Sequence, residues 1–429
     1  MKVKVYPAVC SGAVRVPPSK SLAHRALLCA GLAEGTSCIT GVSSSEDMAA
    51  TCGALEALGA KVVRSGDCCT VSGCGGALFD LPEAAIDCRE SGSTLRFLIP
   101  LAALGRNPVH LTGHGRLMER SQSVYETLFA QQGLRFERQN SRITVQGPLH
   151  GGKIVLDGNV SSQFITGLLF SLPLLPEDSR IEILPPFQSR GYVDLTLDTL
   201  RQFGVQAAFD GEYSLVIPGG QCYQARDAVV EGDYSQAAFF AVLSALRGGI
   251  RLANLRRDSL QGDKAIFPIL ASFGSQTRWA EDTAEILPAH LPAHLTGQRI
   301  DVSNCPDLAP ILSVLGLYSE GTTVLFNAAR LRDKESDRIE AMETELRKLG
   351  AQVESTRDSL TIHGWGNRPA FRETEVSGRN DHRVVMSLAI AATLGSAPVV
   401  IDGAEAIAKS YPDFFDDLRR IGGRAEVLS

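Results

Sequence analysis

The sequence lacks the patterns that mark membrane-spanning and nucleotide-binding proteins. It holds no run of about 20 apolar residues, which a transmembrane helix needs. Neither Gly-x-x-x-x-Gly-Lys-Ser/Thr nor Gly-x-Gly-x-x-Gly occurs, so nothing in the sequence supports a nucleotide or dinucleotide site. The first residues, MKVKVYPAV, predict a strand and carry no signal or transit peptide pattern. We therefore expect a cytoplasmic protein.

The chain as a whole has fewer basic than acidic residues. The 42 Lys and Arg residues are outnumbered by 48 Asp and Glu residues, which gives a net charge of −6 at pH 7. Proteins that bind nucleic acid or anionic membranes in general carry a basic surplus, so we expect neither partner. A site for a small anion would have to be built from a local group of cations.

The cysteines show no metal-binding spacing. Ten are present, eight of them before residue 90, and none forms a Cys-x-x-Cys pair. We interpret them as reduced thiols used as small hydrophobic residues rather than as a disulfide framework or a metal site. His290 and His294 are four residues apart, but Pro292 between them opposes a helix, so a loop is predicted there.

A hydrophobic strand pattern recurs six times at intervals of 69 to 76 residues, centred on Ile39, Leu111, Ile183, Leu252, Leu325 and Ile401. About 20 residues after each centre an amphipathic helix is predicted to end in the glycine of a left-handed C-cap, namely Gly59, Gly133, Gly204, Gly274, Gly350 and Gly422. Before each centre lies a more uniformly apolar segment, which is typical of a core helix.

Each repeat therefore predicts a strand, a buried helix, a second strand, an exposed helix and a hairpin. Parallel strands joined by helices make an α/β architecture, and six such βαβαββ units suggest two domains of three units each. We expect the boundary near residues 224–233. The repeat phase also predicts that the N-terminal strand pairs with the second half of the chain.

Small polar and charged residues gather where the predicted helices start. Helix N-caps explain most of the Ser, Asn, Asp and Gly residues there, but not the basic side chains Lys20, Arg25, His382 and Arg383. The helix dipole disfavours a cation at a helix N-terminus by roughly 0.3 to 1 kcal/mol. Strand-to-helix loops of βαβ units open at one edge of a sheet, where helix N-termini and cations bind anions. We expect a small ligand with more than one anionic group to compensate Lys20.

Nine motifs follow one another along the chain: PSKSLAHRALL, ESGSTLRFL, GRLMERS, SSQF, SRGYVDLTL, PDLAP, RLRDKESDRI, NDHRVVMSLA and AKSYPDFF. Together they resemble the EPSP synthase family of enolpyruvyl transferases, over essentially the whole chain. The resemblance implies the two-domain enolpyruvyl transferase fold, an inside-out α/β barrel-like arrangement of six βαβαββ units. It places one domain at 18–228 and the other at 1–17 plus 229–429, with the active site in the cleft between them.

The resemblance also implies a reaction. The enolpyruvyl group of phosphoenolpyruvate is transferred to the 5-hydroxyl of shikimate 3-phosphate and phosphate is released, a step of the shikimate pathway to aromatic amino acids. It implies no metal and no organic cofactor, favours a monomer and makes the protein a target of the herbicide glyphosate, for which Gly92 leaves room.

The resemblance assigns two sets of binding residues. Those implied to bind phosphoenolpyruvate are Lys20, Gly92, Arg120, Gln163, Arg338, Arg383 and Lys409. Those implied to bind shikimate 3-phosphate are Lys20, Ser21, Arg25, Ser161, Ser162, Gln163, Ser189, Tyr192, Asp307 and Lys334.

Proton transfer is expected to involve Asp307, Glu335 and Lys20. Our hypothesis gives Glu335 the proton at C3 of phosphoenolpyruvate and Asp307 the proton of the 5-hydroxyl, with Lys20 assisting. Glu335 lies three residues before Arg338, so the two are expected to pair at a helix start, which would disfavour the protonated acid until phosphoenolpyruvate engages Arg338.

Two alternatives remain open at this point. The first is the sister activity, UDP-N-acetylglucosamine enolpyruvyl transfer. That family has Lys-Asn where this chain has Lys20-Ser21, and commonly a reactive cysteine on the loop that here reads GRLMERS. The second is a repeat scaffold without catalysis, which would not need five cations on loops of one face.

Overall fold

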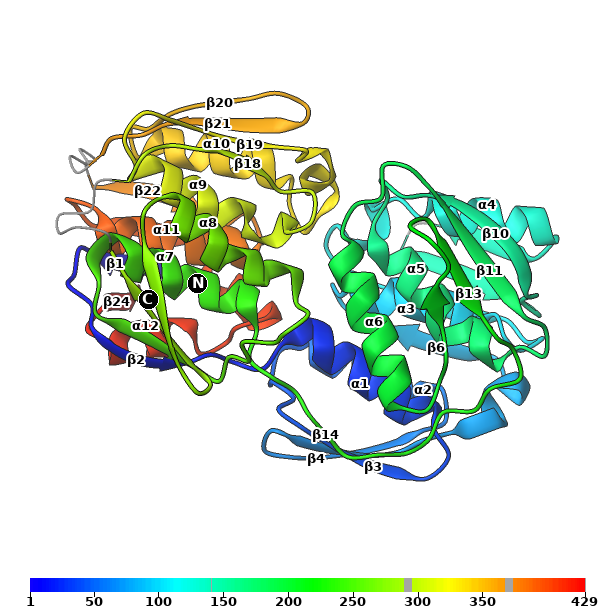
Figure 1. Ribbon diagram of the computed structural model, residues 1–429. Helices are drawn as coiled ribbons and strands as arrows, with labels where there is room; N and C mark the ends of the chain where they lie inside the picture. The colour runs from blue at the N-terminus through cyan, green and yellow to red at the C-terminus, as the bar shows by residue number, and fades with distance from the viewer. Residues whose placement is uncertain (140, 289–294, 367–372, 429) are drawn as a thin grey trace. The chain divides into compact units, whose positions relative to one another are not determined.

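The computed structural model describes residues 1–139, 141–288, 295–366 and 373–428, and the histidine pair His290 and His294 lies outside them. The chain forms two compact units, one made of Met1–Pro17 with Glu231–Ser429 and the other of Pro18–Val230 (Figure 1). The first is called the split unit below and the second the continuous unit. No helix of the described part is long and apolar enough to cross a membrane.

The described residues form six four-stranded sheets, three in each unit. Each sheet corresponds to one repeat of the sequence. The predicted strand centres lie on β3 (Thr36–Thr40), β7 (Val109–Thr112), β11 (Ser179–Leu184), β15 (Ile250–Ala253), β19 (Thr322–Phe326) and β23 (Val399–Asp402). Each of these strands takes the second place in its sheet, between a parallel neighbour and an antiparallel one. The repeat inferred from the spacing is therefore a repeat of sheets.

The parallel neighbours are β14 (Ala228–Val229), β6 (Ala84–Asp87), β10 (Gly152–Asp157), β2 (Gly12–Arg15), β18 (Arg299–Asp301) and β22 (Thr374–Ser377). Five sheets are completed by the hairpins β4–β5 (Lys61–Ser65, Cys68–Ser72), β8–β9 (Arg135–Gln139, Arg142–Gln146), β12–β13 (Ala208–Phe209, Ser214–Ile217), β16–β17 (Gln276–Ala280, Thr283–Leu287) and β20–β21 (Gln352–Ser355, Ser359–His363).

The sixth sheet departs from the predicted hairpin. Strand β1 (Lys2–Tyr6) lies antiparallel between β23 and β24 (Arg424–Leu428), with Val3 opposite both Ile401 and Val427. The two ends of the chain therefore supply the pair of strands that a hairpin supplies in the other five sheets. The expected pairing of the N-terminal strand with the second half of the chain is confirmed.

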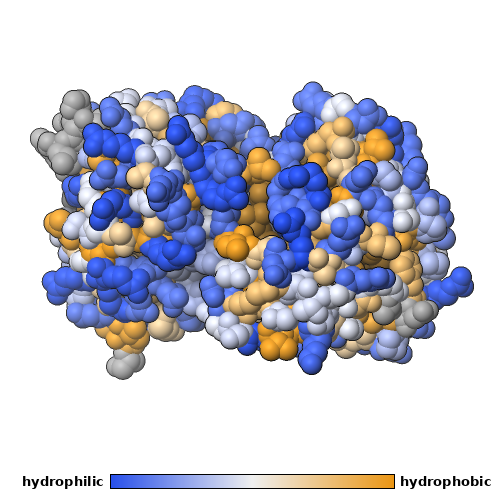
Figure 2. All heavy atoms as spheres, turned by 60° about the horizontal axis from the view of Figure 1, so that its bottom comes forward, coloured by the Kyte–Doolittle hydropathy of each residue, from blue (hydrophilic) through white to orange (hydrophobic). Residues whose placement is uncertain are grey.

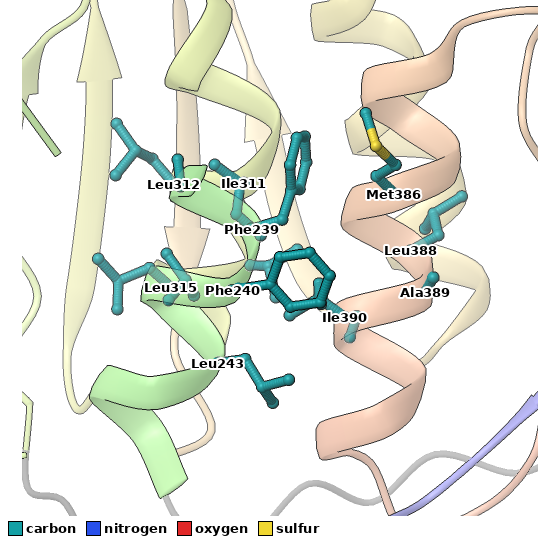
Figure 3. Close-up of a cluster of buried hydrophobic side chains, with 14 of the residues drawn as sticks. Phe239, Phe240, Leu243, Ile311, Leu312, Leu315, Met386, Leu388, Ala389 and Ile390 are labelled. Atoms are coloured by element: carbon teal, nitrogen blue, oxygen red, sulfur yellow. The ribbon is translucent and has the colours of Figure 1, made fainter. Parts of the chain in front are cut away.

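The six apolar segments form buried helices, α1 (Lys20–Leu32), α3 (Gly92–Ala102), α5 (Ser162–Ser171), α7 (Tyr234–Arg247), α9 (Ala309–Leu317) and α11 (His382–Leu394). Figure 3 shows how the last three pack in the split unit, where Phe240 of α7, Ile311 of α9 and Ile390 of α11 belong to one hydrophobic core. In the continuous unit the core is formed by α1, α3 and α5 with the sheets around them.

The amphipathic segments form the helices α2 (Glu46–Ala57), α4 (Ser123–Gln132), α6 (Arg190–Gln202), α8 (Ile266–Ser272), α10 (Arg338–Lys348) and α12 (Phe414–Arg420). The glycine expected to end each of them has a positive φ in every case, from +67° at Gly133 to +103° at Gly274. A side chain at these positions would strain the left-handed backbone, which explains why glycine recurs in the repeat.

Short 3-10 helices occupy several of the connections, η1 (Gly75–Asp80), η2 (Leu117–Glu119), η3 (Leu172–Leu174), η4 (Gly262–Ala265), η5 (Pro306–Leu308), η6 (Ala329–Asp333) and η7 (Ala404–Lys409). On the face presented in Figure 2, hydrophilic side chains alternate with smaller hydrophobic groups. Such scattered apolar exposure is normal for a folded protein surface.

Candidate functional site

In the split unit, three carboxylates converge on the guanidinium group of Arg338. Arg338 is the first residue of α10 and is buried, with 2 % of its surface exposed. Its Nε, Nη1 and Nη2 atoms donate to Asp381, Asp307 and Glu335, each over 2.8 Å. The predicted Glu335–Arg338 pair at a helix start is therefore present, and Arg338 joins the starts of three helical segments.

Asp307 on η5 is the second centre of this cluster. It accepts from Nη2 of Arg383 over 2.9 Å, and Nζ of Lys334 lies 3.5 Å from its other oxygen. Burial disfavours the ionised carboxyl, but the charges of Arg383, Lys334 and Arg338 outweigh burial and hold the pKa of Asp307 well below its ordinary value. Asp307 is therefore a carboxylate at neutral pH, poised to accept a hydrogen bond rather than to donate one.

Arg383 and Lys409 complete the predicted cations of the split unit. Arg383 stands in the first turn of α11 and also donates from Nη2 to the hydroxyl of Ser235, at the start of α7, over 3.0 Å. Lys409 ends η7, and its Nζ donates to the carbonyl oxygen of Asn380 over 2.7 Å. Five of the six predicted residues of the split unit thus lie at or just before helix starts, and the side chain of Lys409, at the end of η7, reaches the residue before the N-cap of α11.

Asp381 is a residue of this cluster that the sequence analysis did not single out. It is fully buried, caps α11 by accepting from the backbone N–H of Arg383 over 2.9 Å, and holds Nε of Arg338. Burial opposes its charge, but Arg338 prevails and lowers the pKa of Asp381. That Asp381 caps a helix could be predicted from the sequence. That it also pairs with Arg338 could not, because this contact depends on where α10 packs.

These pKa directions predict an acid-sensitive fold. Asp307 and Asp381 have folded-state pKa values below the unfolded value of about 3.9, so their stabilising contribution is present above about pH 4 and is lost as the pH falls through the folded values. We expect the free energy of unfolding to decline below about pH 4. Urea titrations between pH 7 and pH 3 measure this, and Asp381→Asn should give a smaller decline. Equal declines in both proteins would contradict the assignment.

In the continuous unit, Lys20 has a partner that the sequence did not reveal. Its Nζ lies 2.8 Å from Oδ2 of Asp47, the second residue of α2, and both side chains are largely buried. Ser19 caps the helix by accepting from the backbone N–H of Leu22. The expectation that a ligand alone compensates Lys20 at the N-terminus of α1 is therefore incomplete, because a carboxylate of the protein contributes.

Arg25 is a buried cation held by neutral oxygens. Its Nε donates to the hydroxyl of Thr196 over 2.9 Å, Nη1 to the carbonyl of Ser21 over 2.6 Å and Nη2 to the carbonyl of Tyr192 over 2.9 Å. Burial lowers its pKa to about 10. No carboxylate among the described residues forms an ion pair with it, so its charge is available to an anion.

A second group in this unit surrounds Gly92, the first residue of α3. A Cβ atom built on Gly92 would lie 2.6 Å from Nη1 of Arg120 and 3.7 Å from Oε1 of Gln163. Gln163 is fixed in turn, since its Oε1 accepts from Arg96 and its Nε2 donates to Ser93, each over 2.9 Å. The absence of a side chain at Gly92 thus lets the Arg120 guanidinium lie against the helix start.

The remaining predicted residues also lie at helix starts. Ser161 caps α5 by accepting from the backbone N–H of Gln163, and Ser162 is the first residue of that helix. Ser189 precedes α6 with a left-handed φ of +57°, and the backbone N–H of Tyr192 donates to its carbonyl. Ser21 is the second residue of α1. The structure therefore places the predicted residues of this unit at or beside a helix N-terminus, except Arg25 in the second turn of α1 and Arg120 directly after η2.

The six repeated units give this chain the fold of known enolpyruvyl transferases. The enolpyruvyl transferase NikO from Streptomyces tendae superimposes with a TM-score of 0.78 over 99% of this chain and 98% of its own, at 16% identity, which is a likeness of fold. EPSP synthase from Acinetobacter baumannii superimposes with a TM-score of 0.80 over the full length of both chains, at 26% identity. The predicted fold class is confirmed.

The family model of EPSP synthase (3-phosphoshikimate 1-carboxyvinyltransferase) matches residues 6–418, and this chain belongs to that family. Proteins named 3-phosphoshikimate 1-carboxyvinyltransferase are similar to it along their length. The one from Clostridium kluyveri is 44% identical over 100% of this chain and 99% of its own. The one from Clostridium novyi is 43% identical over 98% and 97%. The resemblance inferred from the nine motifs is confirmed, and the two alternatives are not favoured.

Proposed function

We propose that this chain transfers the enolpyruvyl group of phosphoenolpyruvate to the 5-hydroxyl of shikimate 3-phosphate and releases phosphate. The observation that carries the proposal is the family match over residues 6–418. The site chemistry supports it, because both substrates carry several negative charges. Lys20, Arg338 and Arg383 lie at helix starts, where backbone N–H groups also favour anions.

The proposed phosphoenolpyruvate set comprises Lys20, Gly92, Arg120, Gln163, Arg338, Arg383 and Lys409. A carboxylate and a phosphate both suit the planar fork of arginine, which supplies paired N–H donors. Arg338 is already engaged by Glu335 through Nη2. We infer that the carboxylate of phosphoenolpyruvate takes this place, so that Glu335 loses its cation and protonation of its carboxyl becomes easier.

The proposed shikimate 3-phosphate set comprises Lys20, Ser21, Arg25, Ser161, Ser162, Gln163, Ser189, Tyr192, Asp307 and Lys334. Arg25 supplies a buried positive charge without a carboxylate partner among the described residues. The serines supply hydroxyl and backbone donors at the starts of α5 and α6. A phosphate group has the charge and the acceptor oxygens that such an arrangement needs.

Proton transfer is assigned to two carboxylates of the split unit. Asp307, kept ionised by its cations, accepts the proton of the 5-hydroxyl as it attacks C2, and Glu335 delivers a proton to C3. In the second half of the reaction C3 gives its proton back to Glu335 while Asp307 passes the hydroxyl proton to the departing phosphate, so each carboxyl group acts once as an acid and once as a base. Lys20 assists through its positive charge.

The direct test follows phosphate release from phosphoenolpyruvate in the presence of a metal chelator. We expect release with shikimate 3-phosphate and none with UDP-N-acetylglucosamine as the acceptor. Release only with the sugar nucleotide would mean that the acceptor site is misassigned. Release with neither acceptor, from protein that is folded by circular dichroism, would refute the proposal and favour a scaffold without catalysis.

Gly92→Ala is expected to weaken the phosphoenolpyruvate site selectively. The added Cβ lies 2.6 Å from Nη1 of Arg120, a flexible side-chain end that can move aside, so the fold should persist while Arg120 is displaced. Losing one hydrogen bond to a charged group predicts a KM for phosphoenolpyruvate about 10- to 100-fold higher and weaker inhibition by glyphosate. Gly53→Ala is the control, because a Cβ on Gly53 of α2 meets nothing within 4 Å. Equal KM values in both variants would contradict the assignment of Gly92.

Arg25→Met is expected to remove most of the binding of shikimate 3-phosphate. At 100 times its dissociation constant the ligand should stabilise the wild-type protein by about 2.7 kcal/mol, visible as a thermal shift. The variant should lose most of this shift because the phosphate loses its buried cation. Arg201→Met, which alters a side chain of α6 that is 75% exposed, should keep it. A full shift in the Arg25 variant would remove Arg25 from the proposed set.

We also propose that the protein acts as a monomer in the cytoplasm. In support of that compartment, all ten cysteines are free thiols, as a reducing environment favours. Sedimentation equilibrium, with and without both substrates, tests the monomer.

A further inference from the structure

Two cysteines on neighbouring strands of the continuous unit face each other. Cys38 on β3 and Cys68 on β5 have their Sγ atoms 2.6 Å apart. In the antiparallel register Cys38 lies opposite Thr70, and Thr40 lies opposite Cys68. Because alternate residues of a strand point to one face, both thiols lie on the same face of this sheet as diagonal neighbours.

These two thiols differ from the core cysteines of the same unit. Cys29 and Cys88 are fully buried and behave as the small hydrophobic residues that the sequence predicts, and Cys69 is also fully buried but interacts with the Cys52 thiol. Cys38 and Cys68 are half-buried and therefore reachable from solvent. Their sulfur atoms are only about 0.6 Å farther apart than in a disulfide, whose S–S bond is about 2.05 Å long.

We propose that Cys38 and Cys68 form a redox modification site, a thiol pair that closes to a reversible disulfide when it meets a low-molecular-weight disulfide. The thiolate of one cysteine attacks the oxidant, which breaks the S–S bond of the oxidant and releases one small thiol. The second thiolate then displaces the other small thiol from the mixed disulfide. Two cysteine S–H bonds are lost, one S–S bond forms, and the two protons and two electrons leave with the two small thiols.

The bond would join β3 and β5 close to a further contact between the segments that follow and precede them. Directly after β3, the backbone N–H groups of Gly41 and Val42 both donate to the carbonyl of Asp67, next to Cys68. The segment 38–68 enclosed by the bond contains α2, which carries Asp47, the partner of Lys20. Because a disulfide restricts the unfolded chain, its closure should stabilise this segment.

Mapping of the crosslink tests the site directly. The native full-length protein is treated with oxidised glutathione, its remaining thiols are alkylated, and it is cut after Lys, Arg and Glu. Cys38 then lies alone on residues 35–46 and Cys52 alone on 47–56, whereas Cys68 lies on 65–83. We expect 35–46 joined to 65–83, about 2 Da lighter than the two thiol peptides together, and release of the pair by dithiothreitol. Fragmentation of the joined peptides separates Cys68 from Cys69.

Three variants define the partners. Cys38→Ser and Cys68→Ser should each abolish the joined peptide, and the control Cys52→Ser should keep it. The hydrogen bond of the Cys52 thiol lowers the pKa of Cys69 to about 7, so Cys52 and Cys69 are the competing pair. A crosslink between those two, or complete alkylation of Cys38 and Cys68 after oxidation, overturns the proposal.

Thermal unfolding supplies a second readout. Oxidised wild-type protein should unfold roughly 5 °C or more above the reduced protein, and the difference should vanish in Cys38→Ser and Cys68→Ser. If the crosslink forms but the unfolding midpoint does not rise, the modification site is supported and its stabilising effect is refuted. This test needs neither substrate, so its outcome is independent of the proposed catalytic activity.

Discussion

Glu335→Gln should reduce kcat by about 10²- to 10⁴-fold while leaving the binding of shikimate 3-phosphate nearly unchanged. The amide oxygen of the substituted side chain can still accept the hydrogen bond that Glu335 takes from Nη2 of Arg338, so the geometry of the cluster should persist. The amide cannot deliver or remove the proton at C3, and loss of a general acid or base typically has this magnitude. Phosphate release measures kcat, and a thermal shift with shikimate 3-phosphate measures binding.

Glu340→Gln is the matched control for this variant. Glu340 lies on the same helix, α10, its side chain is 61% exposed, and its ion pair with Arg379 is long at 3.9 Å. The control should keep the wild-type kcat. A Glu335→Gln enzyme with kcat within a few-fold of the wild type would refute the role of Glu335. Loss of both kcat and shikimate 3-phosphate binding would instead indicate that Glu335 holds the cluster together.

Arg338→Met should destabilise the split unit by about 3 to 5 kcal/mol and abolish activity. Methionine fills much of the same space but removes the cation from Asp381, which is fully buried, and from Asp307 and Glu335. Removing one partner of a buried ion pair leaves an uncompensated buried charge. The loss of folding free energy is then larger than the net stabilisation that the intact pair provides. The ion pairs of Arg383 and Lys334 with Asp307 remain in the variant, whereas the ion pair of Asp381 with Arg338 is lost.

Tryptophan fluorescence during urea unfolding reports this loss selectively. The chain has two tryptophans, Trp279 and Trp365, and both belong to the split unit. Arg347→Met is the control, because Arg347 lies on the same helix with its side chain 53% exposed and pairs with Glu343 at the surface. Exposed pairs contribute about 1 kcal/mol or less, so the control should unfold almost as the wild type does. Equal urea midpoints for the two variants would show that the buried cluster does not stabilise the unit.

Much of the fold could be predicted because the repeat depends on patterns of neighbouring residues in the sequence. The six strand centres, the six apolar helices and the glycines that end the outer helices each depend on periodicity or on one backbone conformation. The structure confirms them at the predicted positions, with a positive φ at all six glycines. The sixth sheet is the exception, since the two places that a hairpin fills in the other sheets are taken by β1 and β24, which lie at opposite ends of the sequence.

The candidate site could be predicted only in part. Motifs at helix starts pointed to the basic residues, because a cation at a helix N-terminus is unusual enough to need a reason. The carboxylates that hold them in place, Asp47 for Lys20 and Asp381 for Arg338, are ordinary N-terminal helix residues in the sequence. Their second role arises from contact with a helix start 27 or 43 residues away in the chain.

The α/β class, the six units, the helix ends and membership of the EPSP synthase family could all be predicted from the amino-acid sequence, because each of these depends on residue type and on spacing along the chain. Which charged side chains far apart in the chain pair with one another could not be predicted, because it depends on the packing of the folded chain. An ion pair or a thiol pair such as Cys38 and Cys68 requires atoms within a few ångströms of each other, and that distance is set by how strands and helices pack rather than by their order in the sequence.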